Sequence, residues 1–357
     1  MMQRSLTTML VIPTGVGASI GGYAGDAIPV ARAIAEISDC LITHPNVMNG
    51  AQLYWPLKNA LYVEGYGLDQ FAAGHWSLQP VLQNRIGLLL DQGIERDLKL
   101  RHCQAADAAR ATLGINVVTV LETDQPLGVT LQTAESGATW GTIQNPDSLL
   151  RAGERLVQEH GVNAIAVVAR FPEDPESEAL EAYRQGQGVD PLAGAEAVIS
   201  HLLVKALEIP CAHAPALSPL PLDLTLSPRS AAEELGYTFL PSVLAGLSRA
   251  PQFKRGSTDG ILRDHVDALV IPASCCGGSA VLSLAHTSTT IIAVRDNSTK
   301  MAVYPQDLGI EAVEVHSYLE AVGVLAGMKA GIDPFRMTNQ TPVSLSVNLE
   351  KETLLLK

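Results

Sequence analysis

The stretch ALVIPASCCGGSAVLSLAHTSTTIIAV, residues 268–294, determines the predicted fold. It is uncharged and long enough to span a membrane, but Pro272, Gly277, Gly278 and His286 interrupt it. The order of apolar run, small-residue turn, helical pattern and second apolar run predicts a strand, a loop, a short helix and a strand. A helix between two strands is the usual connection in a parallel sheet.

The same alternation continues along most of the chain. The apolar runs lack a clean period of two, as expected for strands buried between layers of helices. We therefore predict an α/β fold, mainly a parallel sheet with helices on both faces, arranged as two lobes with a cleft between them. The predicted strands are residues 7–13, 40–43, 60–63, 86–90, 117–121, 164–169, 268–271 and 290–294, and the predicted helices are residues 27–37, 94–113, 148–159, 193–207, 230–247 and 315–330.

Several predicted helix ends carry suitable residues. Asp26 can cap the helix that starts at residue 27, and Pro146 can open another. Glycines stand where helices should end: Gly114, Gly161 and Gly331. These local signals agree with the alternation of strands and helices.

One segment breaks this alternation and predicts a lobe boundary. Residues 128–142 alternate apolar and polar side chains around a central glycine, which predicts a β-hairpin. The predicted organisation is an N-terminal α/β lobe (1–127), a hairpin or linker (128–145), a C-terminal α/β lobe (146–338) and a C-terminal strand or tail (339–357).

Two further segments depart in composition. Residues 172–187 are strongly acidic and predict a mobile surface insertion, and residues 213–228 are rich in proline and leucine and predict an extended crossover or oligomer contact. Leucines at 217–226 and 354–356 need cover, so we expect a homo-oligomer.

Composition narrows the class of protein. Of 357 residues, 47% are hydrophobic, which predicts a globular chain. The formal net charge of -13 repels phosphate backbones and anionic lipids, so we expect neither a nucleic-acid nor a membrane partner. The apolar stretch before Pro13 is too short for a signal-peptide core. An odd number of cysteines without disulfide-type spacing predicts a reduced, cytoplasmic protein: Cys40, Cys103, Cys211, Cys275 and Cys276.

The residues that follow the predicted strands are the first candidates for a site, because ligands of open parallel sheets bind beyond the carboxyl ends of the strands. Glycines at 15–25 leave backbone N–H groups open to an anion, and Arg170 and Arg295 can clamp a carboxylate or phosphate. The alternatives are a flexible loop and surface ion pairs. The predicted substrate-binding residues are Thr14, Gly15, Gly17, Ser19, Asn46, Asn49, Arg170, Ser274, Gly277, Gly278, Ser279, Arg295, Asp296 and Asn297.

The cysteine turn, residues 274–279, is the sharpest local signal. Cys275 and Cys276 precede a predicted helix, whose N-terminus favours a thiolate and lowers its pKa. His44 follows another strand and is the candidate acid–base partner. The alternative is that both cysteines are buried packing residues. A weaker alternative is a metal site that includes Cys211 and His213.

We predict no cofactor. A dinucleotide site needs a helix that begins among the glycines and an acidic residue after the second strand. Here the loop runs on to Asp26 and the strand is followed by His44, so NAD is disfavoured. No CxxC pair or HExxH helix is present, so a metal is disfavoured too.

Three segments in this order, TGVGASIGGYAGDA, THPNVMNGAQ and SCCGGSAVLSLAH, resemble a conserved, mostly cyanobacterial family of undescribed function. That resemblance implies a soluble cytoplasmic protein and no particular catalysis. Residues 266–286 and the following TTIIAV are similar to the second-lobe strand, cysteine and helix of aspartate/glutamate racemases and maleate isomerases. Those families have another cysteine in the first lobe, where this chain has His44. Phosphotransacylases have a comparable strand, turn and helix.

The expected function is an enzyme that acts on a small anionic metabolite in a cleft between the lobes. Cys275 or Cys276 would supply a thiolate and His44 the opposing acid or base, which suits an isomerase, racemase or lyase. Two alternatives remain open. One is an enzyme that binds a nucleotide or phosphorylated metabolite without cysteine catalysis, and the other is a non-catalytic metabolite sensor or scaffold.

Overall fold

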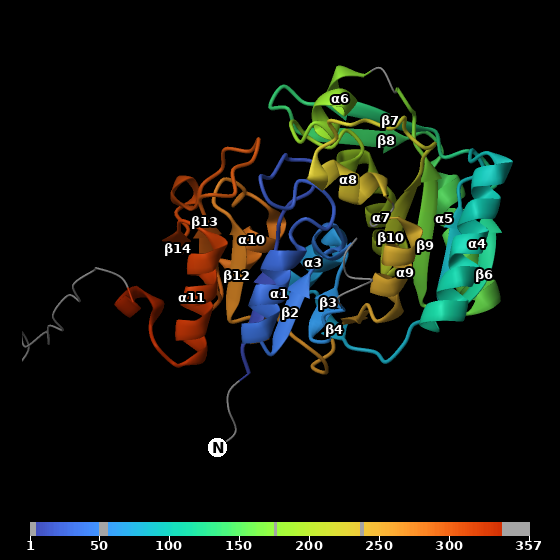
Figure 1. Cartoon of the computed structure of the whole chain (residues 1–357). Coiled ribbons are helices and arrows are strands. Elements are labelled where there is room, and N and C mark those ends of the chain that lie inside the picture. Colours follow the sequence, from blue (N-terminus) through green and yellow to red (C-terminus); the bar gives the residue numbers. More distant parts are fainter. Residues whose placement is uncertain (1–4, 50–55, 175–176, 236–238, 338–357) are drawn as a thin grey trace, which may run out of the picture.

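The computed structural model describes residues 5–49, 56–174, 177–235 and 239–337. Six parallel strands form the large sheet (Figure 1). Its centre is β1 beside β12, so the two ends of the chain build one sheet together. The strand order is β14 (Ala312–Val315), β13 (Thr290–Val294), β12 (Ala268–Pro272), β1 (Thr7–Leu10), β2 (Cys40–Thr43) and β3 (Ala60–Tyr62).

The middle of the chain forms a second, small sheet, which is also parallel. Every residue of β5 and every residue of β9 except the last is buried, because helices cover both faces of these central strands. The order of strands is β10 (Cys211–Ala216), β9 (Ala164–Arg170), β5 (Ile86–Leu90) and β6 (Val117–Glu122).

Helices cover both faces of both sheets. On the large sheet, α1 (Ile28–Ile37) and α11 (Tyr318–Lys329) pack on one face, and α3 (Gly65–Ala72) and α10 (Ser279–Leu284) on the other. On the small sheet, α4 (Arg96–Leu113) and α9 (Leu240–Ser248) lie opposite α5 (Pro146–His160) and α7 (Ala193–Leu207). Each of the two hydrophobic clusters contains residues from both sheets, so the sheets share their cores.

Alternating side chains assign the strands of the large sheet to these two clusters. Leu10 and Leu41 pack in the cluster of α1, whereas their neighbours Met9 and Ile42 pack in the cluster of α3. Because every strand must supply apolar side chains to two faces, the runs are apolar throughout. The α/β prediction, with parallel sheets and helices on both faces, is therefore confirmed.

A hairpin confirms the prediction for residues 128–142. It consists of β7 (Val129–Thr133) and β8 (Thr139–Ile143) and packs on α7. Gly194, near the start of α7, permits this contact, because a Cβ atom there would lie 2.1 Å from the carbonyl oxygen of Thr139. The hairpin thereby fixes the N-terminus of α7.

Several shorter elements complete the fold. An antiparallel pair that the sequence did not predict joins β4 (Trp76–Gln79) to β11 (Gln252–Arg255). Three further short helices are α2 (Pro45–Met48), α6 (Glu178–Arg184) and α8 (Pro228–Glu234). None of the helices in the described ranges combines the length and apolar character that a membrane crossing requires.

Three local predictions were wrong. The single helix expected at 230–247 is divided between α8 and α9, and residues 236–238 lie outside the described part. The acidic insertion contains α6, whose Tyr183 and Arg184 are buried by tertiary contacts that its composition does not reveal. Asp26 does not cap α1, because its carboxylate instead accepts from Gly21 N and pairs with Arg229.

The predicted lobe boundaries do not coincide with the sheets. Strands β5 and β6 belong to the predicted N-terminal lobe but pair with the small sheet, while β12 to β14 return to the large one. The division into lobes stays a prediction. The tail at 339–357 lies outside the described residues. Leu222 and Leu224 are fully exposed, and oligomerisation also stays a prediction.

Candidate functional site

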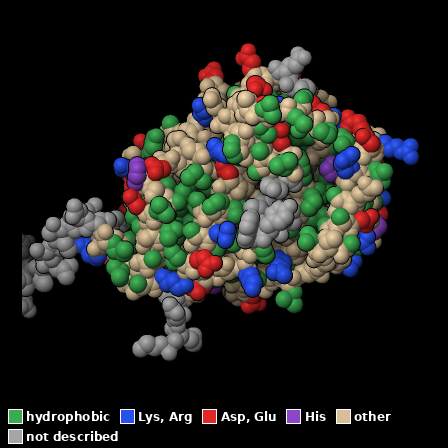
Figure 2. All heavy atoms as spheres, viewed as in Figure 1, with side chains coloured by type: hydrophobic (Ala, Val, Ile, Leu, Met, Phe, Trp, Pro, Cys, Tyr) green, Lys and Arg blue, Asp and Glu red, His purple; other side chains and the backbone are tan. Residues whose placement is uncertain are grey.

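A cavity of about 1530 Å³ lies between the two sheets. The loops after β1, β2 and β12 form one wall, and α7, β10 and the segments around α6 and α8 form the other. The volume exceeds the roughly 300–1,000 Å³ of most small-molecule sites. On the face drawn in Figure 2, basic side chains are scattered among acidic ones without a continuous basic patch.

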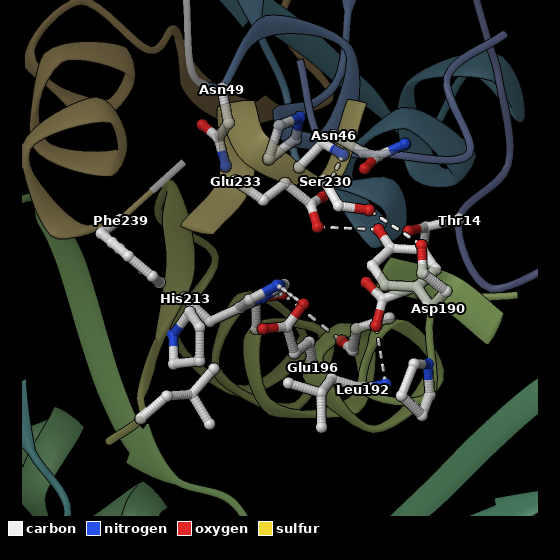
Figure 3. A pocket seen from close by; sticks show the side chains of 18 of the residues that line it. Thr14, Asn46, Asn49, Asp190, Leu192, Glu196, His213, Ser230, Glu233 and Phe239 are labelled. Carbon is white, nitrogen blue, oxygen red and sulfur yellow. Dashed lines mark hydrogen bonds and ion pairs between the residues drawn. The ribbon is translucent and has the colours of Figure 1, made fainter. Parts of the chain in front are cut away.

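Three carboxyl groups and one imidazole converge on this cavity. Asp190 precedes α7, Glu196 lies on its first turn, His213 is on β10 and Glu233 is on α8. We call these four residues the carboxyl cluster. Figure 3 shows Glu233 on one side of the space and Glu196 with His213 on the other. Segments far apart in sequence therefore build one ionisable centre.

Hydrogen bonds hold the cluster from behind. Oδ1 of Asp190 accepts from Leu192 N at 2.8 Å, at the beginning of α7. Nδ1 of His213 lies 3.0 Å from the hydroxyl of Ser200, and its Nε2 lies 3.6 Å from Oε2 of Glu196. Glu196 and Ser200 are one helical turn apart, so α7 presents both to His213.

Glu233 is fixed by the glycine-rich loop and α6. Its Oε1 accepts from Ala24 N at 2.6 Å, and its Oε2 accepts from the Tyr183 hydroxyl at 2.8 Å. The Tyr183 ring stacks on Tyr23 with 4.1 Å between centroids, and Arg229 covers the other side of Tyr23. The Glu233 carboxylate is thus held by a backbone N–H and by a tyrosine whose ring is itself fixed by stacking.

The environment of Asp190 and of Glu233 favours their protonated forms. Burial raises the pKa of Asp190, and the neighbouring charge of Glu196 raises it further. Burial likewise raises the pKa of Glu233, with additional contributions from Asp190 and Glu196. Among the residues that the structure describes, no lysine or arginine forms an ion pair with Asp190, Glu196 or Glu233. Such groups can exchange protons near neutral pH.

The cavity brings together seven of the seventeen residues predicted for catalysis or substrate binding. The lining includes these sequence-predicted residues: Thr14, His44, Asn46, Asn49, Cys275, Gly278 and Ser279. Two of their amides already have partners, because Nδ2 of Asn46 donates to Gly21 O and Oδ1 of Asn49 accepts from the Tyr62 hydroxyl.

His44 is a buried residue with an engaged ring. Its Nε2 accepts from Ile12 N at 3.0 Å, which ties β1 to the start of α2. Burial lowers the pKa of His44 to about 4, so the imidazole is neutral at pH 7. One of its two nitrogens is therefore already used within the fold, and its acid–base role stays a prediction.

The cysteine turn is packed. Sγ of Cys275 lies 3.2 Å from the Thr299 hydroxyl, and Cys276 is fully buried. Burial raises the pKa of Cys275 and raises that of Cys276 to about 12. The expectation of a lowered pKa was wrong, because desolvation outweighs the effect of the short α10 helix. Ser274 bonds to Thr299, and Gly277 packs against Val303; neither lines the cavity.

The expected anion clamps face elsewhere. Arg170 pairs with Glu95 at 2.9 Å and with Glu173, and Arg295 pairs with Glu314. Neither arginine lines the cavity. The surface ion-pair alternative describes both residues, and the sequence could not reveal their partners.

The remaining predicted residues hold loops together and do not line the cavity. Asp296 lies 3.2 Å from His316, and Asn297 holds both backbone polar atoms of Ile20. Ser19 bonds to Ser298. Gly15 and Gly17 have positive φ and pack closely against the hairpin and Val189, respectively. These contacts join the glycine-rich loop to the rest of the fold.

The suggested metal ligands separate. Cys211 is buried and its thiol donates to Ile209 O, while His213 faces Ser200 and Glu196. In the described ranges, no three His, Cys, Asp or Glu side chains form a group that could hold a metal ion.

Sequence reasoning missed six ionisable residues of the cavity that the site is built on: Glu64, Asp69, Asp190, Glu196, His201 and Glu233. One usable signal was present. The predicted helix at 193–207 is strongly apolar, yet Glu196 and Ser200 fall on one side of it with four-residue spacing. The other positions are separated in the sequence and share no motif.

Comparisons with known proteins place the chain among relatives of undescribed role. A family model described as "Protein of unknown function (DUF3326)" matches residues 7–338. A protein from Synechococcus sp., named as an uncharacterized lipoprotein, is 60% identical over 337 residues, which is 94% of each chain. No solved structure matches the chain significantly.

Proposed function

The chain belongs to the DUF3326 family, and from the geometry of its cavity we propose that it is an enzyme that transfers protons on a small molecule. One observation carries this proposal: Asp190, Glu196, His213 and Glu233 converge on the cavity from separate elements. Isomerases and lyases need such acid–base groups beside a bound substrate.

The carboxyl cluster favours a neutral or cationic substrate. A hydroxyl, carbonyl or ammonium group could bond to these carboxyl groups, whereas an anion would be repelled by each of them that is ionised. The two arginines expected to clamp an anion are paired with carboxylates outside the cavity. The anionic metabolite and the cysteine mechanism stay predictions with less support, and the nucleotide and scaffold alternatives also stay predictions.

The test is proton exchange on a library of metabolites in D₂O. Purified full-length protein is incubated with neutral, cationic and anionic compounds, and mass spectrometry reads deuterium uptake and conversion. We expect uptake or conversion in a neutral or cationic compound, lost in the D190N/E233Q double variant. Activity that persists in the double variant, or no change in any compound, would refute the proposal.

A control is needed to show that the loss of exchange arises at the carboxyl cluster. Asp296 lies outside the cavity and pairs with His316, so D296N matches the chemistry of D190N without touching the cluster. Equal loss in D296N would show that the effect is not local to the site.

We also propose a cytoplasmic location. All five cysteines are free, as in reducing compartments. The word lipoprotein belongs to the name of the Synechococcus relative. Cell fractionation together with the intact mass tests this: a membrane fraction carrying an added lipid mass would contradict the proposal.

A further inference from the structure

A second ionisable pair faces the same cavity at the contact between the two sheets. Glu64 follows β3 of the large sheet, and His201 lies on α7, which covers the small sheet. Nδ1 of His201 pairs with Oε1 of Glu64. Helices α3 and α7 pack against each other here, so the pair links a helix of the large sheet to a helix of the small sheet (Figure 1).

The two side chains differ in exposure. Only 4% of the Glu64 side chain is accessible, whereas 42% of His201 is accessible, and both line the cavity. The carboxylate therefore contacts the ring from the closed side at Nδ1, and Nε2 is the nitrogen that Glu64 does not contact. This arrangement of a base held by a buried carboxylate recurs in acid–base enzymes.

Glu64 is itself held in place. Its Oε2 accepts from Tyr66 N at 2.8 Å and caps the start of α3. Each carboxylate oxygen thus has a defined partner, one on the helix and one on the imidazole. A carboxylate tied to a helix N-terminus has little freedom to rotate, so it can fix the orientation of His201.

The absence of a side chain at Gly65 leaves room for the His201 ring in its present orientation. A Cβ atom at residue 65 would lie 2.9 Å from Cε1 of His201, so any larger residue displaces the imidazole. The φ angle of Gly65 is not in the left-handed region, so the backbone does not require glycine there. Glycine lowers helix stability relative to alanine, yet here it leaves room for the ring.

The groups that face His201 are acidic or aromatic. Glu64 immediately precedes α3 and Asp69 lies within it. The ring of Tyr66 lies 6.4 Å from the imidazole, centroid to centroid. Asp69 is also bonded to Ser279 and to the backbone of Ala280 in α10. Burial lowers the pKa of His201, but the hydrogen bond and charge of Glu64, the charge of Asp69 and a hydrogen bond to the backbone of Ala197 raise it overall.

We propose that His201 is a general acid–base residue that acts on a hydroxyl or carbonyl oxygen of the substrate, and that Glu64 is its positioning residue. This rests on the proposed function, because it assigns a second proton-transfer position in the same cavity. Glu196 and His201 are five residues apart on α7, which is about 7.5 Å along the helix axis. The substrate must then extend from the carboxyl cluster to the α3 contact.

The proton cycle balances without a co-reactant. Protonated His201 donates its Nε2 proton to the substrate oxygen while the carboxyl cluster accepts a proton from the substrate, and exchange with water restores both groups. No electron leaves the substrate, so the net reaction is an isomerisation or an elimination of water.

The first measurement needs no substrate. Hydrogen exchange at the imidazole C2 position, followed by mass spectrometry against pH, gives the titration midpoint of each histidine. We expect His201 to titrate above the ordinary 6.5 in the wild type and lower in E64Q. D296N removes the carboxylate beside His316 and should leave His201 unchanged. An unchanged His201 midpoint in E64Q would overturn the assignment of Glu64.

The second measurement uses the compound that exchanges deuterium in the library. H201Q should lower its exchange roughly a hundredfold, a typical contribution of one general acid–base group. G65A keeps every ionisable group and should also lower exchange, because it moves the ring. H316Q is the matched control and should keep full exchange.

The outcomes separate the two proposals. Exchange that survives in H201Q but is lost in D190N/E233Q overturns the role of His201 and keeps the proposed function. No exchange with any compound rejects the proposed function, and the catalytic role of His201 falls with it. Loss of exchange in H201Q and G65A, with D296N and H316Q intact, supports both.

Discussion

The cysteine turn at 274–279 and the cavity face of α7 lie on opposite walls of one cavity, but they differ in how their chemistry arises. The turn concentrates reactive residue types in one short segment, and the fold buries them. Helix α7 is mostly apolar in sequence, and the fold brings carboxyl and imidazole groups from the start of α3, from β10 and from α8 to the side that carries Glu196 and His201. Local density of reactive residues is thus a poor guide to a site assembled by tertiary contacts.

The first prediction tests this difference by removing one ionisable group from each region. E233Q should lower deuterium exchange on the identified substrate by about 10²–10⁴-fold, because one positioned acid–base group is lost. C275S should leave the exchange rate nearly unchanged. Exchange kinetics on purified variants measure both rates. A large loss in C275S with no loss in E233Q would favour catalysis by the cysteine turn.

The second prediction concerns stability. C276S should lower the free energy of unfolding by about 1–3 kcal/mol, because it places a hydroxyl in a fully buried position where the acceptor, Ala273 O, lies 3.5 Å from the present sulfur. C275S should cost less, since the Thr299 hydroxyl is within reach of the new group. Urea unfolding of both variants measures the difference. Equal values would mean that the two thiols have the same surroundings.

The third prediction concerns thiol reactivity. Burial raises the pKa of Cys275 and Cys276, so in the folded protein both should alkylate at least tenfold more slowly than a free thiol with a pKa of about 8.5. Alkylation against pH, resolved by peptide mass spectrometry, checks each residue. Rapid labelling of Cys275 near neutral pH would revive the thiolate hypothesis.

The fourth prediction concerns the pH dependence of stability. The pKa values of Asp190 and Glu233 are raised in the fold, so the folded protein keeps protons that the unfolded chain has released. Stability therefore falls as pH rises from about 4 towards the raised values, by at most about 1.4 kcal/mol per pH unit for each group.

E233Q should flatten that decline, because amides do not titrate. Chemical unfolding at several pH values gives the slope for the wild type and the variant. E159Q is a useful control, since Glu159 is an exposed carboxylate paired with Arg155 on α5. An identical slope in wild type and E233Q would show that Glu233 is not raised in the fold.

Local sequence signals predicted most of the fold. The strands Cys40–Thr43, Ile86–Leu90 and Thr290–Val294 and the helix Ala193–Leu207 have the predicted bounds, because burial on two faces and helical periodicity are written into consecutive residues. Gly114 and Gly161 end their helices in the left-handed conformation as predicted. Strands β4, β10, β11 and β14 escaped prediction, and all four lie at sheet edges or in a separate pair.

The candidate site was predictable only in its location. The ends of β1, β2 and β12 do line the cavity, as the rule for parallel sheets requires. The rule does not say which side chains are free. From the sequence, Arg170 and Arg295 were candidates for binding an anion. In the structure they pair with carboxylates that lie 75 and 19 residues away in the chain.

By itself the sequence determined the α/β class, the parallel strands and the edge of the sheet where the cavity lies, because these follow from short-range periodicity and from general rules of chain geometry. The tertiary structure alone decided that β1 pairs with β12, that the cysteines are buried and that Glu64 meets His201. Ionisation and reactivity depend on solvent exposure and on charges within a few ångströms. Those neighbours come from distant segments, so only the folded chain fixes them.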